Sequence, residues 1–348
     1  MKLGNDLPTY FIADIAANHD GSIDRALNLI ELAAEAGADA AKFQNFRAET
    51  IVSQRGFDEI GRKLTHQASW EKSVFDVYKD AEVPLEWTAQ LVQKCNEVGI
   101  DYFTAPYDLS FIDFFADKMP FFKVGSGDIT WKESLQRMCR HKKPIILATG
   151  ASTIEEVRAA VELIEKSGNP YVLMQCNTNY TGEIGNLQYL NIRVLEEYRR
   201  EFPKAILGLS DHSPGHISVL AAVSLGARAI EKHFTDDVSR VGPDHAFSLD
   251  PISWQKMVVN TRELEMCLGD GIKKIETNEI EARIVQRRAM RYKTDLKAGT
   301  SVSESDLIAL RPAPSDGISP FQIEKFIGKV IRQDVTKDQM VAVADFEV

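Results

Sequence analysis

"YFIADIAANHDGSIDRALNLIELAAEAGADAAKF", Tyr10–Phe43, holds two short apolar runs separated by one amphipathic segment. The runs, Tyr10–Ile15 and Ala38–Phe43, have the length and apolar content of buried strands. The segment between them, Ser22 to Ala36, repeats its apolar residues at helical spacing, and one face would carry Ala26, Leu29, Ile30 and Ala33. "EAGAD" at 35–39 then supplies a glycine where a helix must stop before a strand. We interpret the stretch as a strand–helix–strand unit.

The same alternation continues along the chain. The predicted strands are Tyr10–Ile15, Ala38–Phe43, Asp101–Thr104, Phe121–Val124, Pro144–Ala148, Tyr171–Met174, Ala205–Leu209 and Ala229–Ile230. Helical segments separate them, and Ser152-x-x-Glu155 predicts a capping box at the start of one such helix. Eight strands alternating with helices predict an α/β fold, the closed TIM (β/α)8 barrel.

One connection is unusually long. Residues 47–94, between the second and third predicted strands, exceed one helix plus its loops. We expect an excursion over the barrel mouth, in which residues 65–84 form either a lid or a plain surface helix.

The alternation stops near residue 283, where a short repeat begins. "DLKAGTSVSESDL" (295–307) and "DVTKDQMVAVADF" (334–346) share aspartate, valine and apolar positions at identical spacing. This predicts a small pseudo-symmetric domain at 283–348, after a barrel domain at 1–282. Since so small a domain is marginally stable alone, we expect it to dock on the barrel or on another chain.

Composition excludes several classes of protein. A formal charge of −10 disfavours nucleic acid and anionic membranes as partners. No apolar stretch is long enough to span a bilayer, and the first ten residues lack the pattern of a secretory signal. These features predict a cytoplasmic protein. Four scattered cysteines without CxxC spacing argue against disulfides or a thiolate metal site.

Active sites of TIM barrels lie at the carboxyl ends of the strands, so polar residues there are read together. Candidates found in this way are Asp14, Asn18, His19, Lys42, Gln44, Thr104, Lys123, Ser126, Asp128, Thr149, Gln175, Asn177, Tyr180, Ser210, Asp211, His212, Glu231, Lys232 and His233. The lysines are the most informative, because a lysine inside a barrel strand needs a compensating carboxylate or a bound anion. Lys42 and Lys123 therefore indicate an anionic substrate, or alternatively two structural ion pairs. "KVGSGD" (123–128) can also offer backbone N–H groups to phosphate.

Two histidines follow neighbouring strands. His212 comes soon after the seventh predicted strand and His233 soon after the eighth, so the two imidazoles could share a divalent metal. Two nitrogen ligands with carboxylates and water suit Mn²⁺, Fe²⁺, Co²⁺ or Zn²⁺ better than Mg²⁺ or Ca²⁺. The alternative is a pair of hydrogen-bonded structural histidines.

Taken in order, the motifs resemble those of the bacterial sialic acid synthase family, enzymes that make N-acetylneuraminate and related nonulosonic acids. The resemblance covers nearly the whole chain and is carried by "IADIAANHDGS" (12–22), "KFQ" (42–44), "FKVGSGD" (122–128), "GLSDHS" (208–213), "EKHFTDD" (231–237), "RVGPDHAFSLDP" (240–251) and "LRPAPSDGISP" (310–320). It implies a TIM barrel followed by an antifreeze-like (SAF) domain. It also implies a homodimer in which the SAF domain of one chain covers the other's barrel, with Arg311 reaching the partner's substrate.

The implied reaction is a transferase reaction between phosphoenolpyruvate and the open-chain aldehyde of an N-acylated amino sugar. It gives a nine-carbon 2-keto acid and phosphate. Lys42, Lys123, Ser126 and Ser210 would hold the phosphate and carboxylate, and Asp14 would handle a proton or water. His212 and His233 would hold the metal, expected to be Mn²⁺ with Mg²⁺ or Co²⁺ as alternatives. The resemblance adds Asp244 and Arg311 to the substrate-binding candidates Gln44, Thr104, Asp128, Thr149 and Tyr180.

The chain departs from the family pattern at four positions. Asp14 and Asp128 stand where glutamate is common, and Ala105 and Ala148 where a hydroxyl is common. Thr104 or Thr149 could replace the missing hydroxyls. Two alternatives therefore stay open: a metal-dependent aldol-type enzyme acting on another sugar or keto acid, and a non-catalytic carbohydrate-binding protein.

Overall fold

The computed structural model describes residues 3–62, 67, 68 and 70–347. The chain forms two compact units, Met1–Gly269 and Asp270–Val348. The boundary predicted from the sequence lies after residue 282, so the two divisions differ in the placement of the segment 270–282.

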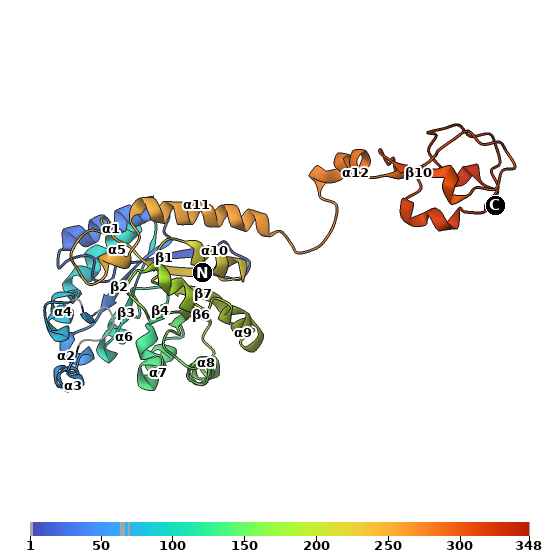
Figure 1. Ribbon diagram of the computed structural model, residues 1–348. Helices are drawn as coiled ribbons and strands as arrows, with labels where there is room; N and C mark the ends of the chain where they lie inside the picture. Colours follow the sequence, from blue (N-terminus) through green and yellow to red (C-terminus); the bar gives the residue numbers. More distant parts are fainter. Residues whose placement is uncertain (1–2, 63–66, 69, 348) are drawn as a thin grey trace. The chain divides into compact units, whose positions relative to one another are not determined.

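The first unit is a nearly closed parallel barrel, as predicted (Figure 1). Its strands are β1 Tyr10–Asp14, β2 Ala40–Asn45, β3 Asp101–Pro106, β4 Phe122–Val124, β5 Ile145–Ala148, β6 Tyr171–Cys176, β7 Ile206–Asp211 and β8 Ala229–His233. The helices around them are α1 Ile23–Glu35, α5 Thr88–Val98, α6 Leu109–Phe115, α7 Lys132–Arg140, α8 Ile154–Ser167, α9 Val194–Glu201, α10 Ile217–Ser224 and α11 Pro251–Leu268. The order of hydrogen-bonded neighbours is β3-β2-β1-β8-β7-β6-β5-β4, so β1 pairs with both β2 and β8. Phe103 of β3 packs against Phe121, next to β4, at the remaining seam.

The opening strand–helix–strand unit folds as its pattern predicts. Ser22 caps α1 by accepting a hydrogen bond from the Arg25 N–H, and the buried face carries the four predicted residues. Gly37 adopts φ +91°, and a Cβ there would also lie 3.2 Å from Val258. The positive φ therefore favours glycine, and a Cβ would also be in tight contact with Val258.

The predicted cap of α8 is wrong by one residue. Thr153, rather than Ser152, accepts the hydrogen bond from the Glu156 N–H, and Glu156 accepts one from the Thr153 N–H. The Ser152 hydroxyl instead donates to the Gly150 carbonyl. In "STIEE" both hydroxyl residues stand three positions before a glutamate, so the pattern alone does not choose between them.

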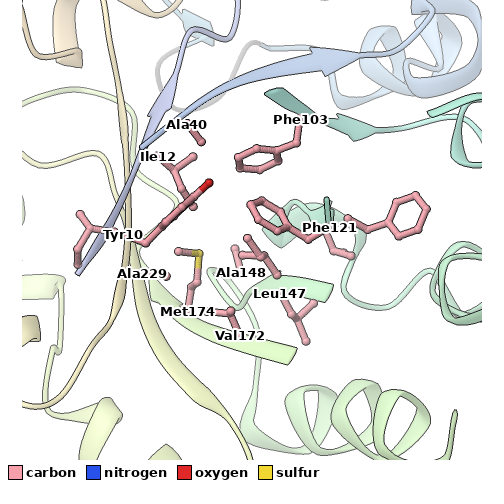
Figure 2. Close-up of a cluster of buried hydrophobic side chains, with 14 of the residues drawn as sticks. Tyr10, Ile12, Ala40, Phe103, Phe121, Leu147, Ala148, Val172, Met174 and Ala229 are labelled. Atoms are coloured by element: carbon pink, nitrogen blue, oxygen red, sulfur yellow. The ribbon is translucent and has the colours of Figure 1, made fainter. Parts of the chain in front are cut away.

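Apolar side chains fill the barrel interior below the strand ends. Figure 2 shows Tyr10, Ile12, Phe103, Phe121 and Met174 turned toward one another. Phe121 is the centre of this packing, with its ring 4.6 Å from that of Phe103 and 6.0 Å from that of Tyr10. The barrel is thus closed by its core at one end, which leaves the carboxyl ends of the strands for a site.

The long connection after β2 is an excursion that contains α2 Ala48–Ile51, α3 Gln54–Ile60 and α4 Val74–Asp80. Among the described residues, six of the connection line the cavity at the strand ends: Ile51, Gln67, Trp70, Val77, Tyr78 and Ala81. The described part therefore reaches the barrel mouth, as predicted. Residues 65, 66 and 69 of the expected lid segment lie outside the described residues.

The C-terminal unit contains α12 Ile280–Gln286, β9 Ala289–Tyr292 and β10 Leu307–Leu310, and it confirms the predicted repeat. The two copies pair reciprocally: Leu296 and Val335 exchange backbone hydrogen bonds. The Asp334 carboxylate accepts from the Ala298 N–H at 3.0 Å, and the Asp295 carboxylate accepts from the Lys337 N–H at 2.7 Å. Such an exchange between equivalent positions is what a local two-fold arrangement produces.

Two further expectations concern the chain as a whole. Within residues 3–62, 67–68 and 70–347, no helix combines the length and apolar character that crossing a membrane requires. All four cysteines are free thiols, three of them buried and Cys267 exposed.

Candidate active site

A cavity of about 460 Å³ lies at the carboxyl ends of the barrel strands. The predicted residues that line it are Asp14, Lys42, Gln44, Lys123, Ser126, Asp128, Tyr180, Ser210, His212, Glu231, His233 and Asp244. They come from β1, β2, β4, β6, β7 and β8 and the loops that follow these strands. Residues up to 230 positions apart in the sequence therefore meet in one site, because parallel strands end at the same edge of the barrel.

Two buried lysines share two buried carboxylates in the cavity. Lys42 Nζ donates to Asp14 Oδ2 at 2.6 Å and lies 3.7 Å from Glu231 Oε2. Lys123 Nζ lies 3.5 Å from Glu231 Oε1 and donates to the carbonyl of Val124. The ion pairs foreseen as the alternative to anion binding are therefore present. Since both lysines also line the cavity, an incoming anion can reach them as well.

The two lysines differ electrostatically. Burial by itself lowers the pKa of Lys42, but Asp14 and Glu231 outweigh it and raise the pKa above its ordinary value. Burial also lowers the pKa of Lys123, and the neighbouring charge of Lys42 lowers it further. The Glu231 carboxylate opposes both effects but does not outweigh them, so the pKa of Lys123 is below its ordinary value. A bound anion near either ammonium group would stabilise its charged form, and for Lys123 this would oppose the lowering caused by burial.

Glu231 is a central residue of the site to which sequence reasoning gave no role. Its Oε1 accepts a hydrogen bond from the Ser210 hydroxyl at 3.0 Å, and its buried Oε2 has no hydrogen-bond partner. The sequence did contain a signal for Glu231, because side chains two positions apart in a strand point to the same face. Glu231 and His233 therefore share the inner face of β8. Lys232, between them, points to the other face and pairs with Asp211 at 2.6 Å.

The two predicted histidines lie side by side, with ring centroids 5.3 Å apart. His212 Nδ1 is 3.1 Å from the carbonyl oxygen of Asn177, and the Tyr180 ring packs on the imidazole at 4.2 Å. His233 Nε2 is 3.5 Å from Asp14 Oδ2, and its buried Nδ1 has no hydrogen-bond partner. Burial lowers the pKa of His233 well below its usual value, so its imidazole is neutral, the form that binds metals.

These two residues fit a cation held by two protein ligands. The unpartnered Nδ1 of His233 and the adjacent His212 ring supply nitrogen donors from neighbouring strands. Within the described residues, no group of three or more histidine, cysteine, aspartate or glutamate side chains is arranged to hold a metal. Further ligands would therefore have to be water or substrate atoms, which is typical of catalytic rather than structural metal sites.

The loops after β4, β5 and β6 meet closely at one side of the cavity. Ser126 Oγ accepts a hydrogen bond from the Gly150 N–H at 2.9 Å. A Cβ on Gly150 would lie only 2.0 Å from Thr178 Oγ1, so only glycine fits there. Thr178 lines the cavity, and its buried hydroxyl has no hydrogen-bond partner. Sequence reasoning missed Thr178, because no strand-end pattern distinguishes it from its neighbours in the loop.

The structure does not bring Thr104 or Thr149 into the cavity, contrary to their predicted role in substrate binding. Thr104 donates to Asn45 Oδ1 at 2.7 Å, since its neighbour Phe103 occupies the inner face of β3. Thr149 donates to the Met174 carbonyl at 2.8 Å and accepts from the Tyr198 hydroxyl. Both hydroxyls are used within the fold, so they do not replace those absent at Ala105 and Ala148.

Arg311 belongs to the C-terminal unit, where its Nε donates to the Gln286 carbonyl at 2.6 Å. The expected role of Arg311, which is to reach the substrate of the partner chain in a dimer, stays a prediction.

Two carboxyl groups in the cavity titrate near neutral pH. Burial raises the pKa of Asp128 to about 6, although the charge of Lys123 opposes the shift. Burial likewise raises the pKa of Asp244 to about 6, against a hydrogen bond from the Ala17 N–H. Both groups would therefore change charge between pH 5 and 7.

The loop that carries Asp244 is tied to the loop after β1. His245 is fully buried and bridges Asp20 at 2.9 Å and the Thr235 hydroxyl at 2.7 Å. Arg240 donates to the same Asp20 carboxylate. This network fixes the loop, and His245 is therefore a structural histidine.

Fold and site together define the class of protein: a (β/α)8 barrel with a charged cavity at its strand ends, followed by a small pseudo-symmetric SAF domain. The NeuB family model matches residues 29–273, and the SAF domain model matches residues 287–347. The chain belongs to the NeuB family.

Several of its relatives are named as synthases of nonulosonic or sialic acids. The N,N'-diacetyllegionaminic acid synthase of Campylobacter jejuni is 33% identical over 341 residues, covering 96% of this chain and 98% of the relative. The pseudaminic acid synthase of the same species is 30% identical over 353 residues, covering 100% of both chains. Among solved structures, the N-acetylneuraminic acid (sialic acid) synthetase of Leptospira borgpetersenii superposes with a TM-score of 0.70 at 27% identity, covering 80% of this chain and 91% of that protein.

Proposed function

We propose that this protein condenses phosphoenolpyruvate with the open-chain aldehyde of an N-acylated amino sugar. The products are a nine-carbon nonulosonic acid and phosphate. C3 of phosphoenolpyruvate forms a bond to the aldehyde carbon, whose oxygen gains a proton and becomes a hydroxyl. Water adds to C2, phosphate leaves, and C2 becomes the ketone of the product. The names of the synthase relatives support the class of reaction.

The observation that carries the proposal is the pair of buried lysines in the cavity. Lys42 and Lys123 present two ammonium groups from within β2 and β4, while Asp14 and Glu231 compensate them when no anion is bound. Phosphoenolpyruvate carries a phosphate and a carboxylate and can replace water around both ammonium groups. Preorganised cations of this kind stabilise charge on a leaving phosphate without reorganising during the reaction.

We assign roles to the remaining residues that their positions in the cavity support. Asp14 lies between Lys42 and His233, so its carboxylate is placed to exchange a proton with the aldehyde oxygen or the attacking water. Ser126, Thr178 and Ser210 offer hydroxyls to the phosphate, and Gln44, Tyr180 and Asp244 offer polar groups to the sugar. A divalent metal on His212 and His233, for which we propose Mn²⁺, would polarise the aldehyde as a Lewis acid.

We also propose a homodimer in which Arg311 acts in the partner's site. The proposal rests on the resemblance of the motifs, and mixing of Arg311 and His212 variants tests it.

The proposal is tested by phosphate release from phosphoenolpyruvate, with Mn²⁺ and a panel of N-acylated hexosamines. We expect release that depends on the sugar. His212→Ala should lower kcat/KM at least about 100-fold, because one of two metal ligands is lost. His216→Ala is the matched control: this histidine contacts Asn260 outside the cavity and should leave turnover unchanged.

Other results would select a different function. Turnover with pyruvate in place of phosphoenolpyruvate would indicate an aldol-type enzyme. Sugar binding that needs no metal and survives His212→Ala, without turnover of any sugar, would indicate a carbohydrate-binding protein.

A further inference from the structure

Tyr107 lines the cavity and comes directly after β3, which ends at Pro106. The strand β3 is hydrogen-bonded to β2 and contacts β4 across the seam of the barrel. These neighbours are the two strands that carry Lys42 and Lys123. Tyr107 therefore enters the cavity from the strand that lies between those of the two buried lysines.

The hydroxyl of Tyr107 lies against the backbone of the loop after β4. A Cβ on Gly125 would be 2.5 Å from the hydroxyl oxygen, so a larger residue at position 125 would displace the tyrosine. Gly125 follows Lys123 by two residues and is the first residue of "GSGD" (125–128), all four residues of which line the cavity. The hydroxyl is thus in the corner between the ends of β3 and β4.

The ring of Tyr107 is fixed at both its backbone and its face. The Tyr107 N–H donates to the Asn45 carbonyl at 2.9 Å. The ring centroid lies 6.3 Å from that of the buried Phe46, which packs in turn on the Tyr78 ring at 5.3 Å. The hydroxyl is therefore held in one place before any substrate binds.

This hydroxyl is free to bind another molecule. Within the part of the chain that the structure describes, it makes no hydrogen bond. The buried Tyr10 hydroxyl, by contrast, donates to Asp101 at 2.5 Å. The hydroxyl of Tyr198 donates to Thr149 at 2.9 Å. Since buried polar groups are normally paired, a fixed phenol that faces a cavity without a partner indicates a ligand.

The hydroxyl of Tyr107 is a donor at neutral pH. Burial raises the pKa of Tyr107 well above its ordinary value, and the charges of Asp128 and Asp14 raise it further. The phenol therefore keeps its proton. A neutral O–H group near two ammonium groups suits an anionic oxygen, because a hydrogen bond to a charged acceptor is stronger than one to a neutral acceptor.

We propose that Tyr107 binds phosphoenolpyruvate by donating its hydroxyl hydrogen to an anionic oxygen of this substrate. This inference rests on the proposed function, which places the anion at Lys42 and Lys123. Next to Gly125, the end of β5 offers only the methyl group of Ala148 to the cavity. Tyr107 thus supplies the hydroxyl in this corner of the site.

Titration calorimetry of phosphoenolpyruvate in the presence of Mn²⁺ tests the proposal without an acceptor sugar. Tyr107→Phe removes the hydroxyl and keeps the ring that packs on Phe46. We expect the Kd for phosphoenolpyruvate to rise at least about tenfold, because a hydrogen bond to a charged group is lost. In the turnover assay, the KM for phosphoenolpyruvate should rise similarly and the KM for the sugar should stay unchanged.

Tyr102→Phe is the matched control. It makes the same chemical change on the same strand, where the buried Tyr102 ring packs on Phe43 at 5.9 Å. Tyr102 is not among the described residues that line the cavity, so this variant should bind phosphoenolpyruvate as the wild type does. A loss of folded protein would lower the number of binding sites in the titration and would not alter Kd.

The outcomes separate this inference from the proposed function. A wild-type Kd in Tyr107→Phe would overturn the inference and leave the synthase function standing. So would a raised KM for the sugar with an unchanged Kd for phosphoenolpyruvate, or equal weakening in both variants. If the wild type neither binds phosphoenolpyruvate nor releases phosphate with any sugar, the proposed function and this inference fail together.

Discussion

At the scale of single residues, the site depends on how charge is balanced in a buried space. Lys42 pairs with both Asp14 and Glu231, whereas Lys123 pairs with Glu231 alone and has the cation of Lys42 beside it. The sequence could show that two lysines lie in strands, but it could not assign their partners. Glu231 and His233 enter the cavity because they share one face of β8, and the partner distances depend on how β2, β4 and β8 are arranged around the barrel.

Asp128 gives a prediction for the dependence of stability on pH. Its pKa rises from an ordinary 3.8 to about 6 in the folded protein, because burial disfavours the carboxylate. The folded state thus binds this proton more tightly than the unfolded state, so stability is lost as pH rises from about 4 through 6. Asp128→Asn removes this loss. We expect thermal unfolding of the variant at pH 7.5 to shift upward by at least about 2 °C, with a smaller shift at pH 4.

Asp113→Asn is the control for this experiment. Arg137 and His141 hold the pKa of Asp113 below its ordinary value, so its carboxylate favours the folded state at neutral pH. This variant should show no gain at pH 7.5. A gain of the same size in both variants, or an equal gain for Asp128→Asn at both pH values, would contradict the assignment to Asp128 burial.

At the scale of elements, the alternation of strands and helices was predictable and the ends of elements were less so. Apolar periodicity identified all eight barrel strands, and the structure extends β8 from Ala229–Ile230 to Ala229–His233. The polar end of that strand broke the apolar pattern because it forms the site. The same alternation that places Lys42 inside the barrel places Thr104 outside it, where its hydroxyl is used by Asn45.

The helix α8 provides a test of the corrected cap. Thr153→Ala removes both the side-chain acceptor and part of the capping box, and should destabilise the protein by about 1 kcal/mol. Ser152→Ala removes only a hydrogen bond to the Gly150 carbonyl and should cost under about 0.5 kcal/mol. Urea unfolding of the two variants measures the difference. A larger loss for Ser152→Ala would restore the cap predicted from the sequence.

At the scale of the whole molecule, the chain is two units with separate hydrophobic cores. The barrel core includes Phe103 and Phe121, and the C-terminal core includes Val302, Val335 and Val341. The repeat explains how so short a unit is stabilised. The equivalent aspartates Asp295 and Asp334 each accept a backbone hydrogen bond from the other copy of the repeat. The sequence predicted this because both copies keep the same spacing.

The proposed dimer is tested by mixing variants. Arg311→Ala and His212→Ala should each reduce activity strongly when expressed alone. If Arg311 acts in the partner's barrel, each mixed dimer has one intact site, and equal co-expression should restore about a quarter of wild-type activity. Co-expression of His212→Ala with His233→Ala is the control and should restore nothing, since both residues belong to one barrel. No recovery in the first pair would show that Arg311 does not act across chains.

The sequence by itself determined the barrel, the SAF repeat and most of the residues at the strand ends. Periodicity and turn residues act locally, so each unit can be recognised from a few neighbouring positions. Only the tertiary structure decided which of those residues face the cavity and what each contacts. It joined Glu231 to two lysines, set the histidine rings side by side, excluded Thr104 and Thr149, and brought Phe46 and α4 against the site. These contacts join residues far apart in the sequence, and their distances follow from barrel closure and core packing, which no local pattern encodes.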